Sequence, residues 1–177
     1  MSTQNYLLSG FGGQGILFAG KFLAYKGLTE GQQVSWLPSY GPEMRGGTAS
    51  CSVIISDEPV GSPIVSNPDI LVAMNLPSLQ KFVDAVVPGG KIIIDSTLID
   101  AKVDRSDVEV FYVPATQMAR DAGFATLANM ILAGKVLKEI DGVAWDGTKE
   151  TLEAFIPAKK ANLIDVNCKA LQLGYDY

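Results

Sequence analysis

The sequence has no histidine and only two cysteines, Cys51 and Cys168, among its 177 residues. Without histidine, the chain cannot supply a Ser-His-Asp or Cys-His catalytic set, or a zinc site with imidazole ligands. Two cysteines so far apart in the sequence cannot hold an iron–sulfur cluster that needs four thiolates. Both lie in regularly patterned segments, so we expect buried, free thiols. We therefore predict no catalytic residue and no metal ligand in this chain.

Positive charge and long apolar runs are scarce as well. The net charge is -5, which gives no basic surface to attract a nucleic-acid backbone. No apolar run approaches the roughly 20 residues that span a bilayer, and residues 1–5 lack the basic start and apolar centre of a signal peptide. We therefore expect neither nucleic acid nor a membrane as a partner, and a cytoplasmic location.

The length suits a single domain over residues 1–177, because a chain of this size buries roughly 70% of its unfolded surface without disulfides or metals. The apolar patterning predicts strands at 6–8, 33–37, 48–56, 70–74, 91–95 and 108–113, and helices at 15–27, 79–86, 115–122, 126–140, 148–155 and 159–173. Pro38 is expected to end the second strand. This order predicts an α/β fold with a largely parallel, Rossmann-like sheet flanked by helices, and a helical C-terminal part.

A glycine loop stands between the first strand and the first helix. Gly10, Gly12 and Gly15 fit the spacing G-x-G-x-x-G, which can receive a phosphate at the start of a helix. A dinucleotide site also needs an acidic residue about 20 positions on, and the sequence V-S-W-L-P at 34–38 has none. Two interpretations stay open. The glycines serve only a tight turn, or they form an anion site to which Gln14 adds a polar side chain at the helix start.

A second loop, at 40–47, combines an aromatic ring, a carboxylate and a guanidinium with three glycines. One interpretation is a surface pair of Glu43 and Arg45, worth roughly 0 to 1 kcal/mol. The other is that Arg45 offers a planar fork to a phosphate or carboxylate while Tyr40 offers a stacking face. Both loops follow the carboxyl ends of strands, where ligands of such sheets gather.

Together, G-F-G-G-Q-G at 10–15 and S-Y-G-P-E-M-R-G-G-T at 39–48 strongly resemble the gamma subunit of 2-oxoacid:ferredoxin oxidoreductases. Further matches to that family are Ala19-Gly20, Ser62-Pro63-Ile64-Val65 before Pro68-Asp69, and Asn129 with Gly134. The resemblance covers nearly the full chain. The R-G-G-T form, with Glu43-Met44 before it, is more similar to members acting on 2-oxoglutarate or branched-chain 2-oxoacids than to those acting on pyruvate.

The resemblance implies the oxidative decarboxylation of a 2-oxoacid, with 2-oxoglutarate favoured, in which coenzyme A (CoA) is consumed and electrons pass to ferredoxin. It also implies that this chain does not perform the chemistry. In the family, thiamine diphosphate and magnesium lie between alpha and beta subunits, and iron–sulfur clusters lie in beta or in a small delta chain. The implied partners are therefore alpha, beta and, in some members, delta, with ferredoxin as acceptor. The chain itself is expected to hold no cofactor, to help bind CoA and to hold the complex together.

Carried over by residue, the resemblance places two loop segments around CoA: Gly12, Gly13, Gln14 and Gly15 in one wall, and Tyr40, Glu43, Arg45, Gly46 and Gly47 in the other. Arg45 either holds a phosphate of CoA or pairs with a partner subunit, and the sequence does not separate these roles. A free-standing nucleotide- or CoA-binding Rossmann-like protein is the alternative function, and a pure scaffold is a third. Self-association of the isolated chain through an uncovered apolar face is also left open.

Overall fold

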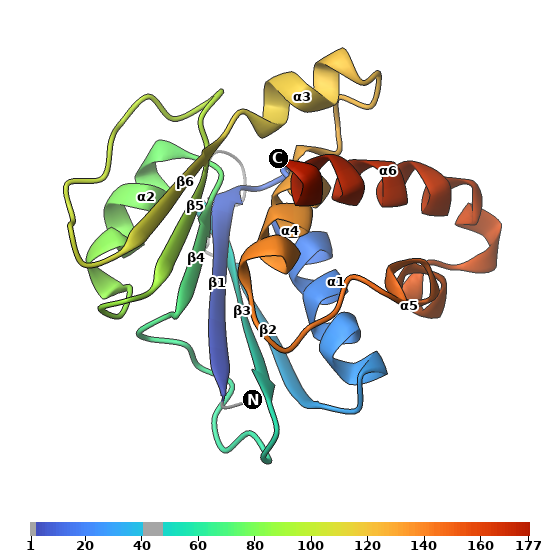
Figure 1. The fold of residues 1–177 in the computed structure, drawn as a ribbon, viewed down its shortest axis with the longest axis horizontal. Coiled ribbons are helices and arrows are strands. Elements are labelled where there is room, and N and C mark those ends of the chain that lie inside the picture. Colours follow the sequence, from blue (N-terminus) through green and yellow to red (C-terminus); the bar gives the residue numbers. More distant parts are fainter. Residues whose placement is uncertain (1–2, 41–47) are drawn as a thin grey trace.

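The computed structural model describes residues 3–40 and 48–177. Its centre is a six-stranded sheet in the order β2-β3-β1-β4-β5-β6 (Figure 1). The strands are β1 (Gln4–Phe11), β2 (Gln33–Tyr40), β3 (Thr48–Ser56), β4 (Ile70–Ala73), β5 (Lys91–Asp95) and β6 (Glu109–Val113). The helices are α1 (Ile16–Thr29), α2 (Leu76–Phe82), α3 (Ala115–Asp121), α4 (Ala128–Glu139), α5 (Thr148–Phe155) and α6 (Asn162–Asp176), with short 3-10 turns at Val83–Ala85 and Ala158–Lys160.

The sheet is mostly parallel, as the alternation of strands and helices predicts. β1, β4, β5 and β6 pair in parallel, while β3 runs antiparallel between β1 and β2. The predicted end of the second strand at Pro38 is wrong, because β2 continues through it to Tyr40. β2 is an edge strand, and an edge strand tolerates a residue without an N–H group on its open side.

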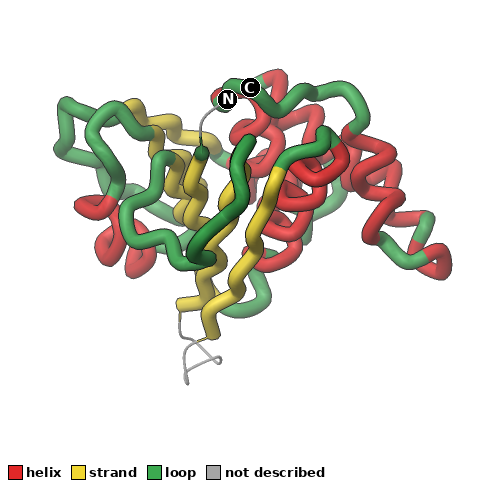
Figure 2. The backbone as a smooth tube through the Cα atoms, turned by 90° about the horizontal axis from the view of Figure 1, so that it is seen from below, coloured by secondary structure: helices red, strands yellow, loops and turns green. Residues whose placement is uncertain are grey.

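Helices cover both faces of the sheet, with the larger group on one side (Figure 2). The larger core lies between the sheet and α1, α4 and α6, and a smaller core lies under α2 on the opposite face. Ile92, Ile93 and Ile94 of β5 are completely buried. Strands covered on both faces are continuously apolar, which is why β4 and β5 could be recognised in the sequence as buried strands.

Close packing of α4 against α6 fixes the helical C-terminal part. Gly134 of α4 lies so near the backbone of α6 that an added side chain would overlap the carbonyl oxygen of Leu171. Gly174 of α6 meets the carbonyl oxygen of Ile131 in the same way. The two glycines therefore allow the helix backbones to approach each other, and any larger residue would push α6 away from the core.

Several details differ from the sequence-based expectations. β1 extends from Gln4 to Phe11, so Gly10 belongs to the strand and the turn begins after it. α2 begins at Leu76 rather than 79, because Asn75 caps it. Both cysteines are free, but only Cys51 is buried, and Cys168 on α6 is partly exposed. In the described part of the chain, no helix is long and apolar enough to cross a membrane.

Candidate functional site

The two loops that stand out in the sequence start from the same edge of the sheet. The backbone of Tyr40, at the end of β2, pairs with Ala49 of β3, and Ala49 pairs with Gly10 near the end of β1. Because β1 and β2 both run antiparallel to β3, their carboxyl ends lie at one edge. The predicted site residues Glu43, Arg45, Gly46 and Gly47 lie outside the described residues, as does the side chain of Tyr40.

The glycine loop needs glycine for two different reasons. Gly13 and Gly15 have φ angles of 91° and 76°, which only glycine adopts without strain. Apart from its chain neighbours, a β-carbon on Gly13 would meet no described residue within 4 Å, so among these residues it is the backbone conformation that requires glycine. Gly10 and Gly15 are crowded, since a β-carbon on Gly10 would lie 3.0 Å from Met74 and one on Gly15 would overlap the Asn129 amide. Gly12 has no positive φ angle.

The side chain of Gln14 ties two strand ends together. Its Oε1 accepts a hydrogen bond of 2.6 Å from the backbone N–H of Phe11, and its Nε2 donates one of 3.1 Å to the carbonyl of Met74. Both ends of the amide are therefore engaged within the chain. In this structure Gln14 fixes the shape of the loop between β1 and α1 by bonding it to the end of β4, and it can support a ligand by holding the loop in place.

A buried polar cluster lies beneath this edge. Ser9 Oγ is 2.8 Å from Ser78 Oγ and 3.1 Å from the carbonyl oxygen of Ala49. Asn75 Oδ1 accepts a hydrogen bond of 2.8 Å from the backbone N–H of Ser78. Among the described residues, Asn75 Nδ2 has no partner although it is buried. A buried donor without a partner is unusual, so Asn75 joins the candidate site.

The sequence reasoning did not single out Asn75, although a signal was present. It follows the apolar segment 70–74 and precedes Leu76 and Pro77. An asparagine before a proline in the first helical turn is a typical helix start. That signal predicts the cap but gives no information about its unpartnered donor.

The start of α1 is a further part of the candidate site. α1 begins at Ile16 after Gly15, with no side-chain cap and no acidic residue in its first turn. The backbone N–H groups of a first helical turn lack intrahelical partners and attract negative charge. A helix start of this kind next to a glycine loop is suited to a phosphate or carboxylate.

The donor set of the described residues does not suit a metal or an iron–sulfur cluster. No three His, Cys, Asp or Glu side chains gather in the part that the structure describes. Cys51 lies in the core on β3, where burial raises the pKa of its thiol to about 12, and Cys168 lies on α6. A thiolate is the form that binds metal, so Cys51 is a poor ligand.

A family model described as pyruvate ferredoxin/flavodoxin oxidoreductase matches residues 5–177. The chain belongs to this family. The family members include a ketoisovalerate oxidoreductase subunit VorA of Methanothermobacter thermautotrophicus, which is 43% identical over 96% of this chain and 35% of its own length. They also include a 2-oxoglutarate synthase subunit KorC of Methanocaldococcus jannaschii, which is 34% identical over 96% of this chain and 90% of its own. The chain thus spans about a third of VorA and most of KorC.

A solved structure supports the same assignment. The gamma subunit of a keto/oxoacid ferredoxin oxidoreductase from Geobacter sulfurreducens has a TM-score of 0.81 and 27% identity, over 98% of this chain and 96% of that one. The family predicted from the two loops is therefore confirmed, and so is the mostly parallel α/β fold with a helical C-terminal part. The relatives are subunits of oxidoreductases, which agrees with the predicted enzyme class.

Proposed function

We propose that residues 1–177 form a non-catalytic gamma-type subunit of a 2-oxoacid:ferredoxin oxidoreductase, located in the cytoplasm. The complex converts a 2-oxoacid and CoA into acyl-CoA and CO2, and passes two electrons to ferredoxin. The observation that supports a ligand role for this chain is the pairing of Tyr40 with Ala49 and of Ala49 with Gly10. It brings the starts of both family loops to one edge of the sheet.

The part of this chain in that reaction is to help bind CoA at this edge. The loop Gly12, Gly13, Gln14 and Gly15 leads into the uncapped start of α1, where backbone N–H groups would receive a phosphate. Arg45 would add a bidentate contact, and Tyr40, Glu43, Gly46 and Gly47 would form the facing wall. Gln14 would act by holding the loop, since its amide already bonds Phe11 and Met74. Asn75 Nδ2 is a further donor at the same edge.

Thiamine diphosphate, magnesium and the iron–sulfur clusters would be held by partner subunits of the alpha, beta and delta kinds. The 2-oxoacid pocket would lie there as well. The loop motif is compatible with a 2-oxoglutarate or a branched-chain substrate. The higher identity to the ketoisovalerate subunit than to the 2-oxoglutarate subunit, 43% against 34%, favours the branched-chain 2-oxoacid over the 2-oxoglutarate expected from the resemblance.

The test is to co-express this chain with the products of neighbouring genes, purify through a tag on it, and measure CoA-dependent dye reduction. Three substrates are compared: 2-oxoisovalerate, 2-oxoglutarate and pyruvate. We expect a cluster-bearing complex that is most active with one of the first two. If the chain instead purifies alone, is monodisperse and binds CoA, the result supports the free-standing binder. If the complex is active but this chain contributes nothing to the CoA kinetics, the result supports a scaffold.

A further inference from the structure

A cavity of about 540 Å³ lies on the helical side of the sheet, among α1, the start of α4, the end of α5 and the start of α6. Figure 1 shows these four helices grouped on the same side of the sheet. Small-molecule sites usually have volumes of roughly 300 to 1,000 Å³. The cavity also touches Gly15, so it adjoins the glycine loop but extends away from the sheet edge.

Two of the residues that line this cavity have a buried side-chain oxygen that lacks a hydrogen-bond donor among the described residues. Asn129 and Asn167 are 4% and 2% exposed, and both line the cavity. Asn129 Nδ2 donates to the carbonyl of Gly15 at 3.0 Å, and Asn167 Nδ2 donates to the carbonyl of Leu163 at 2.8 Å. Because a carbonyl accepts only from the NH2 end of an amide, these bonds fix the positions of the oxygens.

Neither Asn129 Oδ1 nor Asn167 Oδ1 receives a hydrogen bond from any described residue. A buried oxygen without a donor costs free energy, and such groups in native proteins usually have a partner. A molecule that fills the cavity should therefore carry N–H or O–H groups that reach these oxygens.

The charges around the cavity favour an anion. Lys21 of α1 and Lys160, just before α6, line it, and no aspartate or glutamate is among the described lining residues. The described residues offer neither lysine an ion-pair partner. In a chain with a net charge of -5, this is a local concentration of positive charge, and lysine is a common phosphate ligand.

Much of the remaining lining is apolar and includes two aromatic rings. Phe18 and Phe155 lie with ring centroids 5.3 Å apart at a tilt of 54°, and both line the cavity. Lys21 Nζ is 5.8 Å from the centre of the Phe155 ring, so the positive charge adjoins the aromatic wall. Aromatic rings of this kind pack well against a flat heterocycle.

We propose that this cavity binds a nucleoside phosphate. The base would pack on Phe18 and Phe155, its amino group or the ribose hydroxyls would donate to Asn129 and Asn167, and Lys21 and Lys160 would hold the phosphate. The same chemistry is present in a free nucleotide and in the adenosine end of CoA. The proposal does not depend on the proposed CoA site at the sheet edge, because among the described residues the cavity shares only Gly15 with that site, and it needs no partner subunit.

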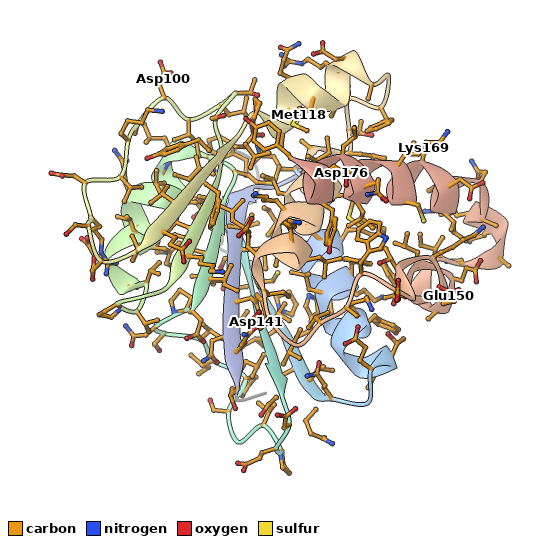
Figure 3. All side chains as sticks on the ribbon, viewed as in Figure 1. Asp100, Met118, Asp141, Glu150, Lys169 and Asp176 are labelled. Atoms are coloured by element: carbon orange, nitrogen blue, oxygen red, sulfur yellow. The ribbon has the colours of Figure 1, made fainter. Side chains whose placement is uncertain are left out.

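The probe is adenosine monophosphate, titrated into the purified full chain by calorimetry. We expect saturable binding, weakened about tenfold by Lys160→Gln and by Asn167→Leu, the size expected for one lost contact to a charged or buried group. Lys169→Gln is the matched control, because Lys169 is exposed on the outer side of α6 (Figure 3) and should leave binding unchanged. Binding that is absent, or equal in all three variants and the parent chain, would overturn the proposal.

A second measurement separates a ligand role of Asn167 from a structural one. Replacing a buried amide whose oxygen lacks a donor with leucine should keep or raise Tm without nucleotide and reduce the Tm increase that the nucleotide causes. A lower Tm with a full nucleotide response would mean that Asn167 serves the fold alone, which contradicts the proposal. Inorganic phosphate that binds as tightly as adenosine monophosphate would also contradict the part assigned to the nucleoside.

Competition identifies the source of the nucleoside phosphate. If CoA displaces adenosine monophosphate and binds more tightly, while phosphopantetheine does not displace it, the adenosine end of CoA is the natural occupant. If CoA does not compete, the natural occupant is a free nucleotide. Arg45→Ala should weaken CoA binding at the sheet edge and leave adenosine monophosphate unaffected, so a failure of the CoA proposal would be seen separately.

Discussion

The carboxyl edge of the sheet and the helical cavity meet at Gly15, yet their polar groups are satisfied to different degrees. At the edge, both ends of the Gln14 amide have partners and Ser78 bonds both Ser9 and Asn75, although Asn75 Nδ2 is buried without a partner among the described residues. In the cavity, two amide oxygens have no donor among the described residues. A preorganised polar edge keeps its shape when it is empty, whereas an unsatisfied cavity gains stability when a ligand supplies donors.

The largest effect should come from the loop that the edge supports. Arg45→Ala is expected to raise the apparent KM for CoA of the assembled complex roughly 10- to 100-fold, because a hydrogen-bonded contact to a charged group contributes about 1.5 to 3 kcal/mol. Steady-state kinetics at varied CoA checks this, with thiamine diphosphate affinity as the internal control. Arg45→Lys should restore only part of the affinity, because one ammonium cannot copy a bidentate contact.

Unchanged CoA kinetics in Arg45→Ala would remove the ligand role. If the complex then dissociates more readily in gel filtration, Arg45 serves a contact with a partner subunit. Either result decides between the two roles that the sequence leaves open for this residue.

The next effect tests whether the edge is preorganised. Gln14→Ala removes the hydrogen bonds to Phe11 and Met74, and we expect a loss of about 1 to 3 kcal/mol in the free energy of unfolding. Urea unfolding measures it. Gln172→Ala is the matched control, since Gln172 bonds only the exposed Asp176 by its side chain, and it should change stability by less than about 0.5 kcal/mol. Equal effects would mean that the Gln14 amide does not hold the loop.

A smaller effect should separate two reasons for glycine in the glycine loop, namely the backbone conformation and the lack of room for a side chain. Gly13→Ala is expected to cost about 1 to 2 kcal/mol, because an L-residue is strained at its φ angle of 91°. Apart from the chain neighbours, no atom of the described residues lies within 4 Å of the added methyl group, so crowding by these residues contributes nothing. Gly12→Ala, at a position without a positive φ angle, should cost less. Differential scanning calorimetry of the two variants compares them, and a larger loss for Gly12→Ala would contradict the assignment.

Much of this edge could be predicted from local sequence. The spacing of Gly10, Gly12 and Gly15 located the turn, and the continuous apolar segments located the central strands. The antiparallel β3 was not predicted. The length of the connection at 41–47 indicated the antiparallel direction. A parallel crossover needs a dozen or more residues, whereas seven residues between strands favour a hairpin.

The cavity could not be predicted in this way. Asn129 and Asn167 lie in ordinary helical segments, and nothing near them in the sequence shows whether their oxygens receive donors. That depends on contacts between residues far apart, such as the bond from Asn129 to Gly15. Similarly, the family resemblance includes Gly134 but gives no reason for it, and the need for glycine at Gly134 and Gly174 arises only where α4 meets α6.

The two cysteines give the mildest comparison, because both belong to the larger core and differ in exposure. Cys51 lies behind α1, where its sulfur is 3.6 Å from the carbonyl oxygen of Ile16 and burial raises its pKa to about 12. Burial also raises the pKa of Cys168, followed by the influence of Asp165, but that side chain is partly exposed on α6.

Since the thiolate is the reactive form, Ellman's reagent at pH 8 should label Cys168 first, more slowly than a free thiol, and Cys51 only as the fold opens. Between pH 7 and 9 the rate at Cys168 should rise with pH, because both pH values lie below its raised pKa. Labelling of Cys51 at the rate of global unfolding would show that the sheet side does not open locally. Rapid labelling of Cys51 in the folded chain would contradict the tight packing of β3 against α1.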